Sequence, residues 1–368
     1  MRCQLKRRRS NGRWFGVAAR IERTQSMSFS EKAKDRYVWF KQREGELEQE
    51  AQKNGGRLAR LNWWRYSYYK YPYLLLETDD AVEDRFVDVF SNGVDITIEG
   101  KISPAPMMMK EGRFSILYTE LLEETGSRGI LTQDVIANAT EQISSYFEGG
   151  VPLGVRMFGE RTHVKDEWLV KYSKKQYIEE MYKYGRLRIA PASEYAKGSH
   201  LKAIKDFETV RNFKLKALEY ALQGKSEVSF RGHSLPIENG VVPLKFMMED
   251  YYLFSTCKEI DRRMPTDFEA DAALIIKDRK AFIELLKSAL FKKNSGWEFL
   301  EGEVYYYDPY NDIPKDENLA FWKHFSYAYQ KEHRCVFKPK NYLYGAAKLE
   351  PFFLELGPLN NISEVVVA

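Results

Sequence analysis

The sequence predicts an α+β protein made of two parts, and three observations support this prediction. The 368 residues exceed what one hydrophobic core usually serves, so two domains are expected. With 44% hydrophobic and 30% charged residues, the composition is that of an ordinary globular protein. Short strand-like segments, separated by helices and long connections, fill the second half of the chain, as in α+β sheet domains.

The composition also excludes several classes of protein. No window of about eighteen residues is apolar enough to cross a bilayer, so no association with a membrane is expected. The three cysteines, Cys3, Cys257 and Cys335, show no CxxC spacing, and the five histidines show no HxH or i, i+4 pairing. We therefore expect neither a disulfide framework nor a metal site, and we expect a cytoplasmic location.

Positive charge is concentrated at the N-terminus. Residues 1–26 contain eight Lys and Arg residues against one Glu, although the whole chain has a formal net charge of only +4. Three interpretations stay open for this extension: a segment that binds nucleic acid through phosphate contacts, a transit peptide, or an upstream translation before a native start at Met27. We expect it to be disordered or non-native, and no function is based on it.

The first part, residues 27–160, is expected to begin with a helix over 28–54. Ser28 and Glu31 form a capping-box pattern, in which each side chain satisfies a free backbone N–H of the first turn. Gly55 and Gly56 should end this helix, because glycine adopts the left-handed conformation without steric cost.

Residues 57–77 form the densest aromatic segment of the chain. Their β-prone residues predict strands interrupted at Pro72. Segments 85–90 and 94–98, joined by Ser91-Asn92-Gly93, predict a hairpin. A helix is expected over 132–147, so this part would be a small α+β domain of unknown role without a catalytic signature.

The second part, residues 161–368, alternates strands and helices. Gly185 should close one helix, and Pro191 should stop the strand after it. Strands are expected over 168–172, 186–190, 227–231, 241–246, 251–256, 272–276, 303–307 and 333–338, and helices over 174–184, 201–223, 279–291 and 319–328.

Gln330 and Glu332 are the first candidates for chemistry. They lie two residues apart, so within a strand their side chains share one face. A glutamate in such a place can stabilise the positive charge that develops at an anomeric carbon when an N-glycosidic bond breaks. The structural alternative is a strand-edge glutamate paired with Arg334 or a nearby lysine.

Other chemistries lack their motifs. The sequence contains no GxxxxGK[ST], GxGxxG or GxSxG, which argues against P-loop, Rossmann and hydrolase-elbow sites.

Several short motifs succeed one another in a defined order in the second half. They are Lys171-Tyr172-Ser173, Gly185-Arg186-Leu187-Arg188-Ile189, Tyr195, Asp206-Phe207-Glu208, Tyr251-Tyr252-Leu253-Phe254-Ser255-Thr256-Cys257, Phe268-Glu269-Ala270-Asp271 and Tyr329-Gln330-Lys331-Glu332-His333-Arg334. This order resembles the ADP-ribosyltransferase-like domains, including bacterial domains of unknown function related to that fold. The resemblance covers residues 165–340 at pattern level, leaves the first part unexplained, and implies a split-sheet fold that holds NAD in a cleft.

The resemblance also implies roles for individual residues. Glu332 matches the catalytic glutamate, and Gln330 the residue two before it, which in some such enzymes contacts the target. The matching NAD-binding positions are Lys171, Tyr172, Ser173, Arg188 and Tyr195, with Tyr195 stacking on the nicotinamide ring. Lys171 departs from the usual Arg or His, and a lysine cannot make the planar bidentate contact of arginine with a pyrophosphate.

Three functions are considered as hypotheses. The first is an NAD-dependent ADP-ribosyltransferase without a metal that modifies a protein or nucleic acid, in the manner of a bacterial toxin or anti-phage effector, with an antitoxin or regulator as a further partner. The first part would recruit the target, through a nucleic-acid surface if its aromatic and basic residues are exposed. The second is a non-catalytic binding protein on the same fold, and in that case Glu332 should pair with Arg334. The third is a nuclease with metal-binding carboxylates among Asp206, Glu208, Asp267, Glu269 and Asp271.

Overall fold

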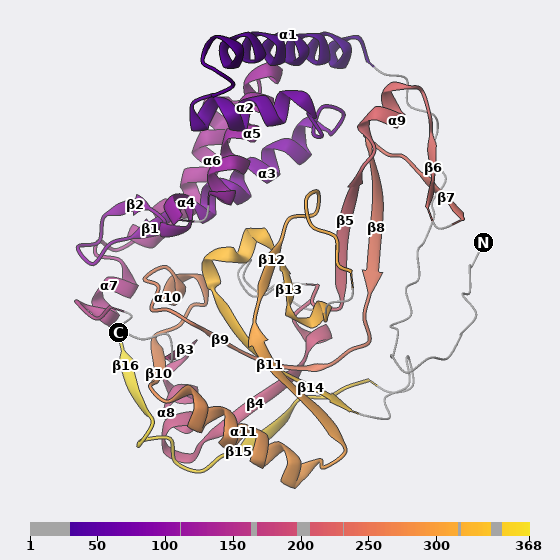
Figure 1. Cartoon of the computed structure of the whole chain (residues 1–368). Coiled ribbons are helices and arrows are strands. Elements are labelled where there is room, and N and C mark those ends of the chain that lie inside the picture. The colour runs from indigo at the N-terminus through magenta and orange to yellow at the C-terminus, as the bar shows by residue number, and fades with distance from the viewer. Residues whose placement is uncertain are drawn as a thin grey trace.

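Helices form most of residues 30–158, and an antiparallel sheet forms the centre of the second part (Figure 1). The computed structural model describes residues 30–110, 112–162, 168–196, 207–230, 232–315, 318–339 and 348–368. The chain is therefore of mixed α and β structure with antiparallel sheets, and the α+β prediction is confirmed.

The helical part lies at the upper left of Figure 1. Its helices are α1 (Glu31–Lys53), α2 (Arg60–Lys70), α3 (Asp79–Asn92), α4 (Pro106–Lys110), α5 (Arg113–Arg128), α6 (Gln133–Ser144), η1 (Ser145–Phe147) and α7 (Leu153–Phe158), and its strands are β1 (Val94–Ile96) and β2 (Ile102–Pro104). Helix α1 confirms the first predicted helix, but its N-cap is Ser30, whose hydroxyl accepts a hydrogen bond from the Ala33 N–H at 3.3 Å. The proposed cap Ser28 lies outside the described residues.

The prediction of strands over 57–77 is wrong, because most of this segment is helix α2. Tyr68 and Tyr69 are buried, and each ring lies 5.6 Å from the ring of Phe40 on α1. Packing against α1 thus outweighs the strand preference of the aromatic residues, which reflects the environment more than the backbone.

The predicted hairpin over 85–98 is also wrong, because its first half belongs to helix α3. The Thr78 hydroxyl caps this helix by accepting from the Ala81 N–H at 3.2 Å. Val82, Phe86 and Val89 are buried on one face at helical spacing. These signals were present in the sequence, and the apparent alternation of residues 85–90 concealed them.

The second part is built on an eight-stranded sheet with the strand order β11-β14-β9-β3-β10-β16, to which β4 and β15 add beside β9. Its strands are β3 (Leu169–Ser173), β4 (Arg186–Pro191), β9 (Tyr252–Cys257), β10 (Ala272–Ile276), β11 (Trp297–Glu303), β14 (Glu332–Pro339), β15 (Phe352–Glu355) and β16 (Ser363–Val367). The sequence missed β11, β15 and β16.

Helices cover both faces of this sheet. One face packs against α8 (Lys175–Tyr184) and α11 (Arg279–Lys293), and the other against α7 and α10 (Met264–Asp267). The predicted stop of α8 is confirmed: Gly185 has a φ of +62°, and a Cβ there would lie 2.1 Å from the carbonyl oxygen of Gly357. Only glycine fits this turn.

The sheet divides beside β9. One edge of β9 pairs with β14 from Tyr252 to Cys257. On its other edge, β4 pairs with Leu253 and Tyr252, and β3 pairs with Cys257. Phe254, Ser255 and Thr256 therefore lie in a gap where neither β3 nor β4 is paired to this edge.

A β-ribbon extends from the sheet toward the helical part (Figure 1). It consists of β5 (Val210–Lys216) and β8 (Val241–Met247), and α9 (Leu218–Leu222), β6 (Glu227–Phe230) and β7 (His233–Pro236) lie at its end. The predicted helix over 201–223 is wrong over residues 207–217, whereas α9 lies within its last part, and residues 201–206 lie outside the described part. All of β5 pairs with β8. Arg211 and Phe213 are buried and Asn212 between them is exposed, and this alternation is typical of a strand.

One hydrophobic cluster joins the helical part to the second part. It contains residues of α1 to α6 together with Leu218, Val241 and Phe325. Arg85 of α3 also donates to the Asp308 carboxylate at 2.7 Å, and both side chains are buried. The two parts of the sequence thus share a core and a buried ion pair.

Candidate functional site

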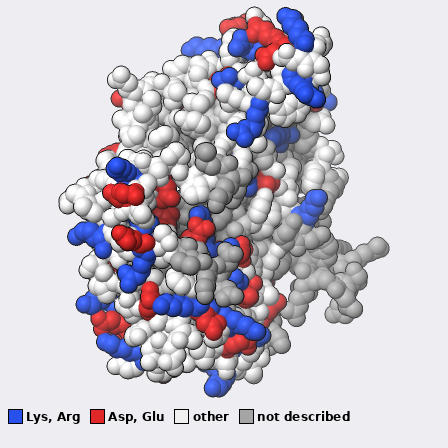
Figure 2. Space-filling view, turned by 60° about the vertical axis from the view of Figure 1, so that its left-hand side comes forward, with Lys and Arg blue, Asp and Glu red and all other residues white. Residues whose placement is uncertain are grey.

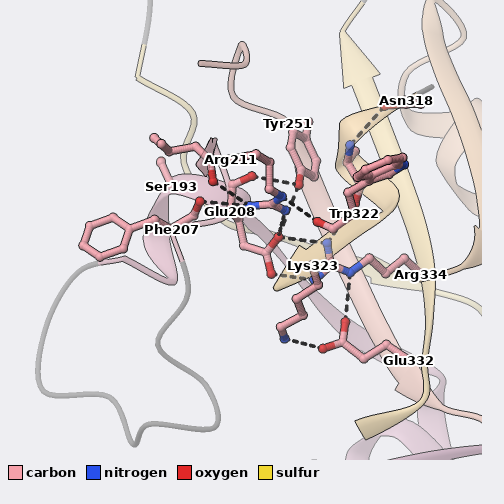
Figure 3. A network of polar contacts seen from close by, with 12 residues as sticks. Ser193, Phe207, Glu208, Arg211, Tyr251, Asn318, Trp322, Lys323, Glu332 and Arg334 are labelled. Carbon is pink, nitrogen blue, oxygen red and sulfur yellow. Dashed lines mark hydrogen bonds and ion pairs between the residues drawn. The ribbon is translucent and has the colours of Figure 1, made fainter. Parts of the chain in front are cut away.

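Arg334, on the central strand β14, is the centre of a buried network of ion pairs (Figure 3). Its Nη2 and Nη1 donate to the two carboxylate oxygens of Glu208 at 2.6 and 2.8 Å, and its Nε donates to Glu332 Oε2 at 2.9 Å. Arg211 donates to Glu208 Oε2 at 2.9 Å. The side chains of all four residues are buried.

Lys323 connects the two residues that the sequence singled out. Its Nζ donates to Oε1 of Glu332 and, at 2.9 Å, to Oε1 of Gln330. The backbone N–H of Glu332 donates to the Tyr306 hydroxyl at 2.7 Å. Glu332 therefore has both carboxylate oxygens bonded in a buried place.

The local fold that positions Lys323 differs from the sequence prediction. The helix expected over 319–328 is wrong, because this segment forms the 3-10 turn η3 (Leu319–Phe321), the strand β13 (Trp322–His324) and the 3-10 segment η4 (Phe325–Gln330). β13 pairs in parallel with β12 (Tyr305–Tyr307), and this pairing takes precedence over helix propensity.

Gln330 and Glu332 both reach Lys323, but they do not belong to one strand. Gln330 ends η4, and Glu332 begins β14. Lys331 between them has a φ of +45°, a left-handed conformation that is uncommon for a residue with a side chain. This turn brings the two neighbours to the same Nζ.

The network keeps both glutamates ionised. Burial alone would raise the pKa of Glu332, but the charges of Lys323 and Arg334 outweigh it and hold that pKa below its ordinary value. For Glu208, burial is likewise outweighed, by Arg334 and Arg211, and its pKa is strongly lowered. Among the described residues, Arg334 pairs with both carboxylates, Arg211 pairs with Glu208, and Lys323 pairs with Glu332.

Lys171 adds a further cation at the division of the sheet. Its Nζ donates to the carbonyl oxygen of Ser255 at 2.8 Å, in the gap beside β9, and lies 4.8 Å from the ring centroid of Phe254. Burial lowers the pKa of Lys171, while negative charge at Cys257 and Glu332 would raise it. A lysine has three N–H donors, and among the described residues this one forms no ion pair and has a single hydrogen-bond acceptor.

Tyr195 lies near the network, and Arg188 lies on the exposed side of β4. Tyr195 packs against the buried cluster that includes Ala192 and Val336. Burial, followed by the charge of Glu208, raises the pKa of Tyr195 to about 12. Arg188 is exposed on β4 and donates to Glu194 at 2.5 Å.

Tyr172 and Ser173 do not join this group. The Tyr172 side chain packs on the opposite face of the sheet, 6.2 Å from the Phe268 ring, and its hydroxyl accepts from the Asp261 N–H at 3.0 Å. Ser173 ends β3 opposite Ala272, and among the described residues its side chain has no hydrogen bond.

Of the carboxylates considered for a nuclease, Asp206 lies outside the described residues, and Glu208, Asp267 and Asp271 have separate partners. Glu208 is held by Arg334 and Arg211, Asp267 accepts from the Tyr146 hydroxyl at 2.7 Å, and Asp271 accepts from the backbone of Lys175. In the described ranges, no three His, Cys, Asp or Glu side chains come together in a way that could hold a metal ion.

Lys323 is the residue that sequence reasoning missed. It is nine residues before Glu332 in a segment expected to be helical, and no local motif marks it. Arg334 and Glu208 were noted, but their mutual contact, across 126 residues, could not be predicted.

Comparisons with known proteins do not place the chain in a family. No family model matches it, and no curated protein or solved structure matches it either. Within the part of the chain that the structure describes, no helix combines the length and the hydropathy that a membrane span requires.

Proposed function

We propose that this chain is an NAD-dependent ADP-ribosyltransferase, with residues 161–368 as a split-sheet ADP-ribosyltransferase-like domain that modifies a macromolecular acceptor. Two kinds of observation support it: the order of the sequence motifs, and the arrangement of side chains around β3, β9 and β14. Its acceptor class, protein or nucleic acid, is left open by the site itself.

The observation that carries the proposal is the partly buried Lys171 side chain in the gap of the sheet. Among the described residues Lys171 forms no ion pair, and its Nζ has a single hydrogen-bond acceptor, the Ser255 carbonyl oxygen at 2.8 Å. A buried charge is costly unless it is paired. A pyrophosphate would supply the missing negative charge, and an ammonium group with free donors can bind it as a point charge.

Glu332 would act on the ribose. When the bond between the anomeric carbon and nicotinamide breaks, its electron pair leaves with the nicotinamide nitrogen, and positive charge develops on the ribosyl group. An ionised carboxylate in a buried site stabilises this charge more than it would in water. The acceptor's nucleophile, or water, then forms the new bond to the same carbon.

This role requires a rearrangement. Lys323 occupies Oε1 of Glu332 and Arg334 occupies Oε2, so a ribose hydroxyl can bind Glu332 only if Lys323 gives up its bond. Gln330 Oε1 accepts a second hydrogen bond from Lys323 Nζ at 2.9 Å. Lys323 can therefore keep this hydrogen bond when it releases Glu332.

The test is the release of nicotinamide from NAD by the full chain, without added metal and with cell lysate as the acceptor source. The variants are Glu332→Gln, which keeps the shape of the side chain, and Lys171→Met, which keeps Glu332. We expect Glu332→Gln to lose about 100-fold or more in turnover, as for loss of an electrostatic stabiliser of the transition state. Lys171→Met should raise KM about tenfold with a smaller effect on turnover.

Two controls make the outcome decisive. Circular dichroism and thermal unfolding must show that the variants fold, because Glu332 is part of a buried network. ADP-ribose binding, measured by calorimetry, should persist in Glu332→Gln and weaken in Lys171→Met. A folded wild type that releases no nicotinamide with any acceptor and does not bind ADP-ribose would overturn the proposal.

A non-catalytic binding protein on the same fold is the second candidate, and one observation favours it. Glu332 pairs with Arg334 at 2.9 Å and with Lys323, as expected of a carboxylate whose role is to hold the sheet together. Under this candidate, ADP-ribose would not bind and Lys171 would only satisfy the Ser255 carbonyl in the gap.

A further inference from the structure

We propose that the exposed face of helix α2 binds single-stranded nucleic acid. This inference does not depend on the proposed function, because it concerns a different surface in the helical part and has a separate measurement.

Helix α2 has one buried side and one exposed side. Tyr68 and Tyr69 are buried against α1, whereas Trp63 is 55% exposed. Residues three or four apart share a face of a helix, and this spacing connects the exposed or half-buried residues of the outer face. They are Arg60, Trp63, Trp64, Ser67 and Lys70.

Most basic residues around this face are exposed and lack an ion pair within the described ranges. Between Asn54 and Leu76 the chain contains four Lys and Arg residues and no Asp or Glu. Arg65 pairs with Glu123 at 2.7 Å, but the other three form no ion pair among the described residues. These three are Arg57, Arg60 and Lys70, and all are exposed.

The aromatic rings lie between these charges. The guanidinium of Arg60 lies 5.3 Å from the ring centroid of Trp64, and Lys70 Nζ lies 5.9 Å from that of Tyr66. The ring centroids of Trp63 and Tyr66 lie 5.8 Å apart. Exposed cations reach phosphates and an exposed indole stacks on a base, which together are the requirements for binding a single strand without sequence preference.

Helix α1 sets the border of this surface. Glu48 accepts from the Tyr66 hydroxyl at 3.0 Å, and Glu50 accepts from the Asn62 amide at 3.1 Å. Figure 2 shows charged side chains of both signs at the upper end of the molecule, above a broad area with few charges. A phosphate chain is therefore confined to the side of α2 that faces away from these glutamates.

The length of the helix fits a short stretch of nucleic acid. Eleven residues span about 16 Å, which is roughly five stacked nucleotides at 3.4 Å each. A protein partner is a weaker fit, because the exposed apolar residues of α2, Leu61 and Trp63, are two residues apart and do not share a helix face, whereas Trp63 shares its face with the exposed cations Arg60 and Lys70. An acidic peptide would use the cations but not the exposed indole.

The experiment measures binding of the full chain to fluorescein-labelled oligo(dT) and oligo(U) of about 15 nucleotides, by anisotropy at about 50 and 200 mM salt. Trp63→Ala should weaken binding about tenfold. The double variant Arg60→Gln/Lys70→Gln should weaken it and reduce the slope of log K against log salt by about 1.4, which is two phosphate contacts on a single strand.

Controls of the same chemistry are available on the far side of the molecule. Tyr184→Ala removes an aromatic side chain that is 64% exposed on α8, and Lys280→Gln removes an exposed charge on α11. Both should bind as the wild type does.

Three outcomes would overturn the inference. They are no binding at the lower salt concentration, binding that the α2 variants leave unchanged, and equal binding of a poly-glutamate peptide with the same dependence on Lys70. The second would assign the affinity to another segment, such as the basic residues 1–26, and the third would make an acidic peptide the partner.

Discussion

Removing Arg334 should destabilise the protein more than removing any exposed arginine. In Arg334→Met the side chain keeps much of its volume but loses its bonds to Glu208, to Glu332 and to the carbonyl oxygen of Ala320 at 2.8 Å. Breaking a buried ion pair by removing one partner costs about 3–5 kcal/mol, because a charge is left without its partner. We expect a loss in this range at pH 7, since Arg211 and Lys323 still partly hold the two carboxylates.

The loss should depend on pH in a defined direction. The pKa values of Glu208 and Glu332 are lowered in the folded protein, so the stability they contribute is present above the ordinary glutamate pKa and is lost as pH falls through the lowered values. In the variant less positive charge opposes the effect of burial, and we expect these pKa values to rise above the ordinary one. The difference in unfolding free energy between wild type and variant should therefore shrink between pH 7 and pH 5.

Urea unfolding followed by tryptophan fluorescence and by circular dichroism provides the measurement. The matched control is Arg186→Met on the same sheet, where the pair with Glu180 at 3.4 Å is exposed and should contribute no more than about 1 kcal/mol. A loss for Arg334→Met as small as for the control, or one that does not change with pH, would refute the account of a buried, ionised network.

Two further changes test other parts of the structure. Burial raises the pKa of Asp261 to about 6, so this residue favours the fold when protonated, and its stabilisation is lost as pH rises from about 4 through 6. In Asp261→Asn the amide oxygen can still accept the hydrogen bond that Asp261 accepts from the Arg263 N–H at 2.8 Å. The variant should raise the unfolding free energy by about 3 kcal/mol at pH 8 and by about half as much at pH 5. An equal gain at both pH values would contradict the raised pKa of Asp261. Gly185→Ala should cost about 3 kcal/mol or more in thermal unfolding, because the residue has a positive φ and the new Cβ would meet the Gly357 carbonyl oxygen. A normal melting temperature for this variant would show that the turn can shift.

The strands nearest the candidate site were predictable because their signals are local. Residues 168–172, 186–190, 251–256 and 333–338 alternate or are continuously apolar between turn residues, and the structure has a strand at each. Gly185 ends α8 as expected. Glu332 begins β14, one residue before the strand predicted over 333–338.

The errors arose where distant partners decide local structure. Residues 60–70 form a helix because α1 covers Tyr68 and Tyr69, and residues 210–216 form a strand because β8 pairs with them. Both partners lie outside the segment whose structure they decide, and short segments with both preferences adopt the structure that buries more of their surface.

The sequence by itself determined the α+β class, the positions along the chain of most strands in the second part, and Gln330 and Glu332 as the residues to examine. Only the tertiary structure showed that Lys323 binds both of them, that Arg334 links Glu332 to Glu208, and that Lys171 lies in the gap of the sheet. The physical reason is the range of the interactions. Periodicity and turn chemistry act over a few residues, whereas ion pairs form between strands whose neighbours are set by the fold.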